Sequence, residues 1–170
     1  MNKSNLEIER KYIIAMPDIE EMQEMESYCK SEILQIYLPS KNGETHRIRR
    51  RIYSDKTVCT ETVKVRVDKM SSNEFEREIS EAEFNVLASS FDPNTHPIDK
   101  TRHTFIYNTQ LFEIDIYPAW KNTAIMETEL ESREAFVEMP CFIRIVREVT
   151  GDKRYSNAGM SRVFPEEDHL

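Results

Sequence analysis

The amino-acid sequence predicts an α+β fold that is mainly β: an eight-stranded antiparallel β-barrel with helices packed on the outside. Two observations carry this prediction. Stretches in which apolar and polar residues alternate recur along the chain, and short turns join several of them. The 170 residues contain no Gly/Ser-rich linker and no internal repeat, which favours a single domain over residues 1–170 with one sizeable core.

The predicted strands are the segments with the clearest period of two, in which successive side chains point to opposite faces. They cover residues 5–14, 33–38, 45–53, 57–67, 73–80, 99–107, 110–117 and 123–130. Short turns suffice to join antiparallel strands, whereas parallel strands need long crossovers. The arrangement therefore favours an up-and-down barrel over a parallel α/β sheet.

Three helices are expected between these strands. Residues 18–30 begin with Asp and early glutamates and carry apolar residues at helical spacing. Residues 80–83, Ser-Glu-Ala-Glu, form a capping box that predicts a second helix ending before Pro93. Ser132 is expected to cap a third helix that ends before Pro140. A basic-then-polar tail over residues 149–161 closes the domain.

The composition is that of a folded, soluble protein with an unusual amount of charge. Hydrophobic residues make up 39% of the chain and charged residues 32%, above the roughly 25% of average domains. The net charge of −8 argues against broad binding to nucleic acid or to an anionic membrane surface. No apolar run approaches the roughly 20 residues of a membrane helix. We therefore expect no nucleic-acid partner and no membrane association.

Cysteine usage and the N-terminal segment predict a cytoplasmic location. Cys29, Cys59 and Cys141 are odd in number and far apart, so they indicate neither a disulfide framework nor a zinc site. Residues 1–4 are polar and lack the apolar segment of a signal peptide.

The predicted strands share a feature that ordinary half-buried strands lack: their polar faces carry several charges of one kind. Glu7, Glu9 and Lys11 share a face in the first strand. Later strands carry, in order, Arg47, Arg49 and Arg51; Lys64 and Arg66; Glu74, Glu76 and Glu78; Lys100 and Arg102; Glu113 and Asp115; and Glu127 and Glu129. If the apolar faces pack outward against helices, these charged faces point into the barrel.

The residue types on these faces predict the ligand. Arg and Lys suit a chain of phosphates, Arg through paired planar donors and Lys as a compact charge. Clustered carboxylates suit hard divalent cations, chiefly Mg²⁺ or Mn²⁺. Burying so many charges is expensive, and linked phosphates with two metal ions would reconcile both sets in one cavity. For any single strand, a plain solvated face remains the alternative.

The chain resembles the CYTH, or triphosphate tunnel metalloenzyme, family in a series of ordered motifs. Residues 6–12, Leu-Glu-Ile-Glu-Arg-Lys-Tyr, resemble the Glu-x-Glu-x-Lys signature of that family. The likeness continues through residues 35–38, 47–51, 62–64, 76–78, 98–102, 113–115, 127–129 and the tail 149–157. Each motif is short, but together they cover nearly the whole chain.

The resemblance implies a tunnel-shaped barrel that binds triphosphate compounds with two Mg²⁺ or Mn²⁺ ions. The implied metal ligands are Glu7, Glu9, Glu113, Asp115, Glu127 and Glu129. The implied substrate-binding residues are Lys11, Arg47, Arg49, Lys64, Arg66, Lys100 and Arg102. Tyr37 is either a substrate contact or an amphipathic wall residue. Glu7 and Lys11 are the expected catalytic residues, with Glu7 orienting a metal ion or its water.

Two departures from the family pattern are expected to lie away from the tunnel. The turn at residues 68–73 lacks the glycines common in relatives, and Lys153 stands where a proline is frequent. Arg50 lies on the opposite face of its strand by alternation, so it is left out of the site.

Hydrolysis of inorganic triphosphate is the favoured function among four. Thiamine triphosphatase and adenylate cyclase activities also occur in the family, but cyclase relatives typically carry a His-Phe element that this sequence lacks. A non-catalytic polyphosphate-binding module is the fourth possibility, and the acidic pairs argue against it. The expected partner is a small-molecule triphosphate substrate. The resemblance is compatible with a homodimer, and the sequence leaves the physiological triphosphate open.

Overall fold

The computed structural model describes residues 6–41 and 43–168. Within these ranges the strands are β1 (Leu6–Ala15), β2 (Glu26–Leu38), β3 (Glu44–Ile52), β4 (Thr57–Arg66), β5 (Ser71–Ile79), β6 (Ile98–Tyr107), β7 (Gln110–Ile116), β8 (Thr123–Glu129) and β9 (Ile145–Glu148). All the predicted strands form, and β9 is an addition. The polar start at residues 1–4 and the first predicted strand residue, Asn5, lie outside the described residues.

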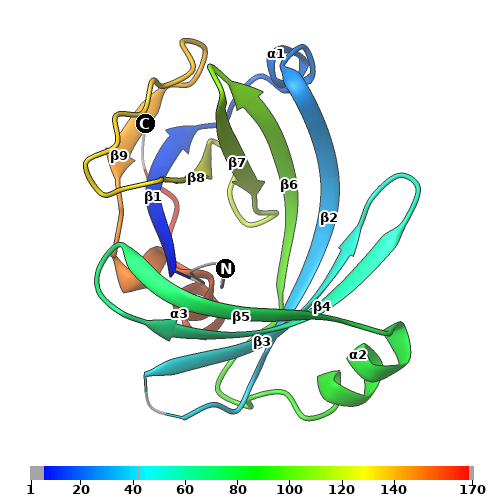
Figure 1. Cartoon of the computed structure of the whole chain (residues 1–170). Helices are drawn as coiled ribbons and strands as arrows, with labels where there is room; N and C mark the ends of the chain where they lie inside the picture. Colours follow the sequence, from blue (N-terminus) through cyan, green and yellow to red (C-terminus); the bar gives the residue numbers. More distant parts are fainter. Residues whose placement is uncertain (1–5, 42, 169–170) are drawn as a thin grey trace, which may run out of the picture.

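The strands form one antiparallel sheet that closes on itself (Figure 1). Neighbours follow the order β5-β4-β3-β2-β6-β7-β8-β1, and a pairing of β5 with β1 completes a ring of eight. This closing pairing is short, since only residues 6–8 of β1 face residues 71–73 of β5. Further along β1, Tyr12, Ile13 and Ile14 pair with β9. The predicted mainly β fold is therefore confirmed as a ring of eight antiparallel strands.

The helical elements in the described ranges are short: α1 (Ile19–Gln23), α2 (Glu81–Ala88), the 3₁₀ turn η1 (Lys153–Tyr155) and α3 (Asn157–Arg162). The capping box forms as predicted at the start of α2. The Ser80 side chain accepts a hydrogen bond from the Glu83 amide, and the Glu83 side chain accepts one from the Ser80 amide. Phe84 then packs into an outer apolar cluster with Ile48 and Cys59, so α2 covers the outside of β3 and β4.

The first predicted helix is much shorter than expected. Residues 18–30 predict one helix, but α1 ends at Gln23 and β2 begins at Glu26. Pairing with a distant strand overrides the local helical pattern here. Glu26 lies opposite Ile106 near the end of β6, so this part of the chain forms strand hydrogen bonds with β6. The register of this pairing shifts between residues 26 and 29, where Ser27 adopts a φ of 54°.

The third predicted helix, after Ser132, was wrong. In the part of the chain that the structure describes, residues 131–144 contain only turns and irregular backbone. This segment packs Val137 and Ile143 against apolar side chains on the outside of the ring, including Phe105 and Phe112. A strap of irregular chain therefore covers the surface for which a helix was expected.

Apolar residues also fill one end of the ring interior. Ile13 of β1, on the same face as Lys11, packs with Ile125, Tyr117 and Trp120. The C-terminal segment completes this cluster with Val149, Tyr155 and Met160. The cluster seats η1 and α3 against the ring, so the C-terminal segment becomes part of the interior wall. None of the helices in the described ranges is long and apolar enough to cross a membrane.

Candidate functional site

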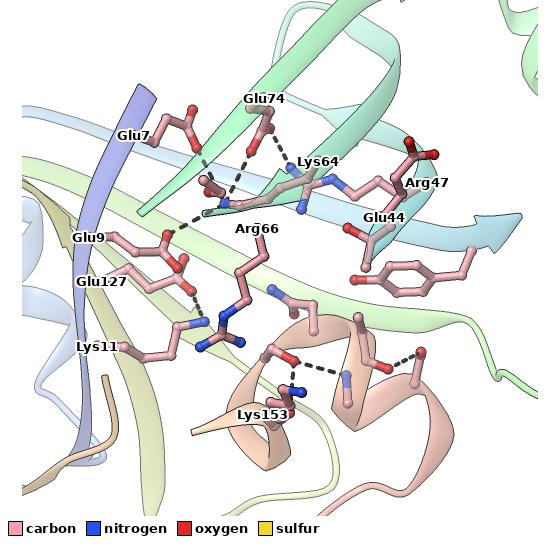
Figure 2. Close-up of a pocket in the computed structure, with 18 of the residues that line it drawn as sticks. Glu7, Glu9, Lys11, Glu44, Arg47, Lys64, Arg66, Glu74, Glu127 and Lys153 are labelled. Carbon is pink, nitrogen blue, oxygen red and sulfur yellow. Dashed lines mark hydrogen bonds and ion pairs between the residues drawn. The ribbon is translucent and has the colours of Figure 1, made fainter. Parts of the chain in front are cut away.

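The charged strand faces line a cavity of about 630 Å³ inside the ring. Figure 2 shows charged side chains of β1 meeting those of β4 and β5 across this space, with α3 below them. The lining strand residues include Glu7, Glu9, Lys11, Tyr37, Arg47, Arg49, Arg51, Lys64, Arg66, Glu74, Glu76, Arg102, Glu113, Glu127 and Glu129. All predicted site residues are among them except Lys100 and Asp115.

The acidic wall of the cavity comes from β1, β7 and β8. Strand register places Glu9 opposite Glu129 and Glu113 opposite Glu127. Partial burial, together with the carboxylates of Glu113 and Glu9, raises the pKa of Glu129 above its ordinary value. Within the described residues, Glu129 forms no ion pair with a cation. Neighbouring carboxylates that repel one another in this way favour binding of a cation between them.

Glu7, Glu74 and Lys64 form a cluster where β1 and β5 close the ring (Figure 2). Lys64 Nζ lies 3.3 Å from a Glu7 oxygen and 3.2 Å from a Glu74 oxygen. Burial, followed by the adjacent Glu74 carboxyl group, raises the pKa of Glu7 to about 7. Burial opposes ionisation of Glu74 as well, but Arg47 and Lys64 outweigh it and lower its pKa to about 2. Glu7 is therefore the member of this pair that takes up a proton near neutral pH.

Arg47 and Arg49 on β3 are not fully neutralised by carboxylates of the described residues. Arg47 Nη2 pairs with Glu74 at 2.8 Å, but the buried Arg47 Nε has no hydrogen-bond partner. Arg49 pairs with no carboxylate in the described residues, and its Nε and Nη2 donate to Gln35 Oε1 at 3.3 and 3.1 Å. Burial and the charges of Arg47 and Arg102 lower the pKa of Arg49 to about 10. A buried guanidinium without a counter-ion favours an anionic ligand.

A network of buried ion pairs lies beneath the acidic wall. Its contacts are Lys11 to Glu127 at 2.6 Å, Arg102 to Glu127 at 2.9 Å, Arg102 to Asp115 at 2.6 Å, Lys100 to Asp115 at 2.5 Å, and Arg102 to Glu113. Burial works against the charge of Lys11, but Glu127 and Glu9 raise its pKa above the ordinary value. Burial lowers the pKa of Lys100 to about 7, even though Asp115 opposes the shift. Alternating signs let these charges neutralise one another out of water.

Lys100 and Asp115 therefore lie elsewhere than predicted. Both side chains are 0% exposed, and neither lines the cavity. Lys100 Nζ also donates to Asn157 Oδ1 at 3.3 Å, which ties it to α3. Arg102 does reach the cavity, but Nε, Nη1 and Nη2 all donate to carboxylates. The β6–β7 register sets Arg102 opposite Asp115, so these charges satisfy each other first.

The C-terminal segment lines the cavity as well, which the charged strand faces did not predict. Its lining residues include Lys153, Ser156, Asn157, Gly159 and Arg162. Residues 68–70 of the β4–β5 turn and residues 71–72 at the start of β5 line the cavity as well. Both departures from the family pattern that were expected to be peripheral thus lie at the site. One feature of the sequence does indicate that this tail packs against the domain. Tyr155 and Met160 are apolar residues in an otherwise polar tail, and both are buried in the structure.

Glycine is required where this segment folds back on itself. A Cβ at Gly159 would collide with the backbone carbonyl of Lys153. The Ser156 hydroxyl joins the same two residues, since it donates to the Lys153 carbonyl at 2.8 Å and accepts from the Gly159 amide at 3.0 Å. The absence of a side chain at Gly159 therefore lets η1 and α3 pack closely at the edge of the cavity.

The acidic wall offers donors that suit Mg²⁺ or Mn²⁺, because both prefer carboxylate oxygens. Over residues 6–41 and 43–168, no three carboxylate, histidine or cysteine side chains converge closely enough to hold an ion as they stand. Glu127 is already held by Lys11 and Arg102. Glu7, Glu9 and Glu129 have weaker or no cation partners, so their oxygens are the more available for a metal ion.

Comparison with known proteins finds solved structures of similar fold. The chain matches no protein-family model and no curated protein. It is similar to the crystal structure of the inorganic triphosphatase NE1496, with 26% identity, a TM-score of 0.59, and coverage of 94% of this chain and 97% of that one. It also shares its fold with protein PH1819 from Pyrococcus horikoshii OT3, at 22% identity and a TM-score of 0.53, over 75% of this chain and 80% of that one.

A third similar structure is a conserved hypothetical protein from Pyrococcus furiosus, at 19% identity and a TM-score of 0.57, over 75% of this chain and 80% of that one. At this identity the likeness concerns the fold alone. The likeness to NE1496, by contrast, extends over nearly the full length of both chains. Together with the ring of eight strands, this likeness agrees with the resemblance of the ordered Glu-x-Glu-x-Lys, arginine and glutamate motifs to the CYTH (triphosphate tunnel) family.

Proposed function

We propose that this protein is a metal-dependent phosphohydrolase whose substrate is inorganic triphosphate. One observation carries the proposal above all: the partly buried Arg49 guanidinium lines a charged cavity and, among the described residues, pairs with an amide and with no carboxylate. Arg47 beside it retains an unsatisfied buried Nε. Phosphate oxygens are the acceptors that match both groups in charge and geometry.

The cavity lining favours an inorganic substrate over a nucleotide or thiamine compound. Among the lining residues of the described chain, Tyr37 is the sole aromatic side chain, and its hydroxyl is held in a polar network. Pockets for organic ligands are usually lined mainly by apolar and aromatic groups. Here the cavity has a basic wall, formed by Arg47, Arg49, Lys64 and Arg66 on β3 and β4, besides the acidic wall on β1, β7 and β8, as suits a chain of phosphates with its counter-ions. The inorganic triphosphatase NE1496 agrees with this choice.

Glu7, Glu9 and Glu129 are the residues that we expect to hold Mg²⁺ or Mn²⁺, with Glu113 and Glu127 beside them. When bound, such an ion neutralises phosphate charge and lowers the pKa of a bound water. The protein's own contribution is placement, because phosphoryl transfer needs mainly positioning and charge stabilisation. Arg47, Arg49 and Lys64 hold the phosphate chain against the basic wall.

Lys11 links the two walls. Its Nζ is fixed by Glu127 at 2.6 Å and points into the cavity beside the acidic wall (Figure 2). A fixed ammonium at this place stabilises negative charge that develops on the departing phosphate. Glu7 lines the cavity at the same wall, where it is placed to orient a metal ion or its water.

The test is product analysis with purified protein. Inorganic triphosphate, ATP and thiamine triphosphate are incubated separately with Mg²⁺ or Mn²⁺, and the products are identified. Release of phosphate and diphosphate from inorganic triphosphate, faster than from the two organic compounds, is the expected result. Cyclic AMP with diphosphate from ATP would instead identify a cyclase. Protection of triphosphate without turnover would identify a binding module.

A further inference from the structure

Gln35 of β2 is a fully buried polar residue between two side chains of the cavity wall. Its side chain is 0% exposed and lies between Arg49 and Tyr37, two residues that line the cavity. The β2–β3 register sets Gln35 directly opposite Arg49. Burying a primary amide is costly unless both ends are hydrogen-bonded, and here both ends are.

The orientation of the Gln35 amide follows from its neighbour. A guanidinium can only donate, so the Gln35 oxygen must face Arg49, whose Nε and Nη2 reach it at 3.3 and 3.1 Å. The amide nitrogen then faces Tyr37 and donates to its hydroxyl oxygen at 2.7 Å. The opposite orientation would set amide hydrogens against guanidinium hydrogens and is excluded.

The Gln35 amide also determines the direction in which the Tyr37 hydroxyl can donate its hydrogen. Because the oxygen accepts from Gln35, the O–H is free to donate elsewhere. Within the described residues it meets no acceptor, and Tyr37 lines the cavity. Burial raises the pKa of Tyr37, so the hydroxyl keeps its proton.

We propose that Gln35 is a positioning residue that aims two donors, the Arg49 guanidinium and the Tyr37 hydroxyl, at the phosphates of the substrate. The inference rests on the proposed function, because it requires a phosphate ligand in the cavity. Of the two alternatives for Tyr37, it favours the substrate contact over the amphipathic wall residue. The amide must be neutral for this role, since it accepts hydrogen bonds from Arg49 without cancelling the positive charge that attracts the ligand.

Replacing Gln35 by Glu removes the donor to Tyr37 and adds a negative charge beside Arg49, with almost no change in side-chain shape. A carboxylate accepts at both ends, so the Tyr37 hydroxyl would turn to donate to it and away from the cavity. The carboxylate would also neutralise Arg49. We expect Gln35→Glu to weaken triphosphate binding by more than about tenfold, the effect of one lost hydrogen bond to a charged group. Tyr37→Phe alone should weaken it about tenfold for the same reason.

The decisive feature is the coupling between the two positions. If Gln35 acts through Tyr37, then Tyr37→Phe should have almost no further effect in a Gln35→Glu background. A role in packing alone would instead give additive losses. Gln23→Glu, which adds the same charge on the exposed end of α1, is the matched control and should bind like wild type.

The experiment is isothermal titration calorimetry with inorganic triphosphate in metal-free buffer, on all four proteins and the double variant, each checked for folding by thermal melting. Equal affinities of wild type and Tyr37→Phe, or additive losses in the double variant, would overturn the role of Gln35. If Gln35→Glu does not fold, Gln35→Met removes both hydrogen bonds without adding a charge and takes its place. Tyr37→Phe should then have almost no further effect in the Gln35→Met background. Absence of binding to wild type would overturn this inference, whereas the proposed function would fail only if triphosphate were not turned over with Mg²⁺ or Mn²⁺ present.

Discussion

Arg102 and Asp115 are joined by two parallel hydrogen bonds across the β6–β7 pair, Nε to Oδ1 at 2.6 Å and Nη2 to Oδ2 at 2.7 Å. Both side chains are almost completely buried, and Lys100 Nζ approaches the same carboxylate at 2.5 Å. One carboxylate therefore balances two cations beneath the cavity. These groups hold the acidic wall in place, and Arg49 remains the cation with spare capacity for the ligand.

Asp115 should accordingly be the most sensitive point of the fold. Asp115→Asn leaves Lys100 and Arg102 without their shared counter-ion, so the free energy of unfolding should fall by about 3–5 kcal/mol. Lys100→Met should cost clearly less, because Asp115 keeps its paired contact with Arg102. Urea denaturation measures both, with the exposed Asp99→Asn as a control on the same sheet. Equal small losses for Asp115→Asn and Asp99→Asn would contradict the assignment.

Arg49 should show the reverse pattern. Arg49→Gln removes a partly buried cation that pairs with no carboxylate among the described residues, so the free energy of unfolding should stay the same or rise. The KM for triphosphate should rise about tenfold or more, since a charge-assisted contact to phosphate is lost. Steady-state kinetics and thermal melting together separate the two effects. Arg50→Gln is the matched control, because Arg50 stacks 5.2 Å from the Phe84 ring on the outer face; an equal KM effect there would refute a specific role for Arg49.

Glu129 should be important for metal binding and unimportant for folding. Its pKa is raised by partial burial and by Glu113 and Glu9, so Glu129→Gln should leave the metal-free protein equally or more stable. The same variant should bind Mn²⁺ about tenfold or more weakly, because one of the available carboxylates is gone. Calorimetry with Mn²⁺ alone gives the affinity, and Glu131→Gln just beyond β8 serves as control. Unchanged Mn²⁺ affinity would remove Glu129 from the metal site.

Glu7 gives a prediction about pH. Its folded-state pKa is raised, to about 7, so the stability it contributes is present below the unfolded pKa of roughly 4.5 and is lost as pH rises through about 7. Glutamine mimics the protonated form. Metal-free Glu7→Gln should therefore match wild type near pH 5 and exceed it in stability at pH 8, while Glu78→Gln on the exposed part of β5 follows wild type throughout. If instead the stability of the wild type increased relative to that of Glu7→Gln toward pH 8, the pKa of Glu7 would not be raised.

Much of the fold could be predicted because the strands carry their pattern locally. The alternation in residues 6–15 distinguishes Glu7, Glu9 and Lys11 on the inside from Tyr12 and Ile14 on the outside, and the structure agrees. Residues 26–32 could not be recognised as strand, since their partner is β6, some 70 residues away. Local helical spacing in residues 18–30 was overruled by that long-range pairing.

The candidate site was predictable as a set of charges and much less as a set of partners. The sequence places Arg49 and Arg102 on equivalent inner faces, yet Arg102 is fully engaged by carboxylates and Arg49 by none. This difference arises from cross-strand register, which sets Asp115 opposite Arg102 and the neutral Gln35 opposite Arg49. Alternation along one strand contains no information about the residue on the next.

The most direct single measurement is phosphate release from inorganic triphosphate with Mn²⁺ or Mg²⁺ present, and again after EDTA has removed the metal. We expect multiple turnovers with metal, no turnover after EDTA, and recovery when metal is returned, because the acidic wall and the phosphate chain each need the cation. Absence of turnover with either metal, or turnover that EDTA leaves unchanged, would contradict the proposal that this charged ring is a metal-dependent triphosphatase.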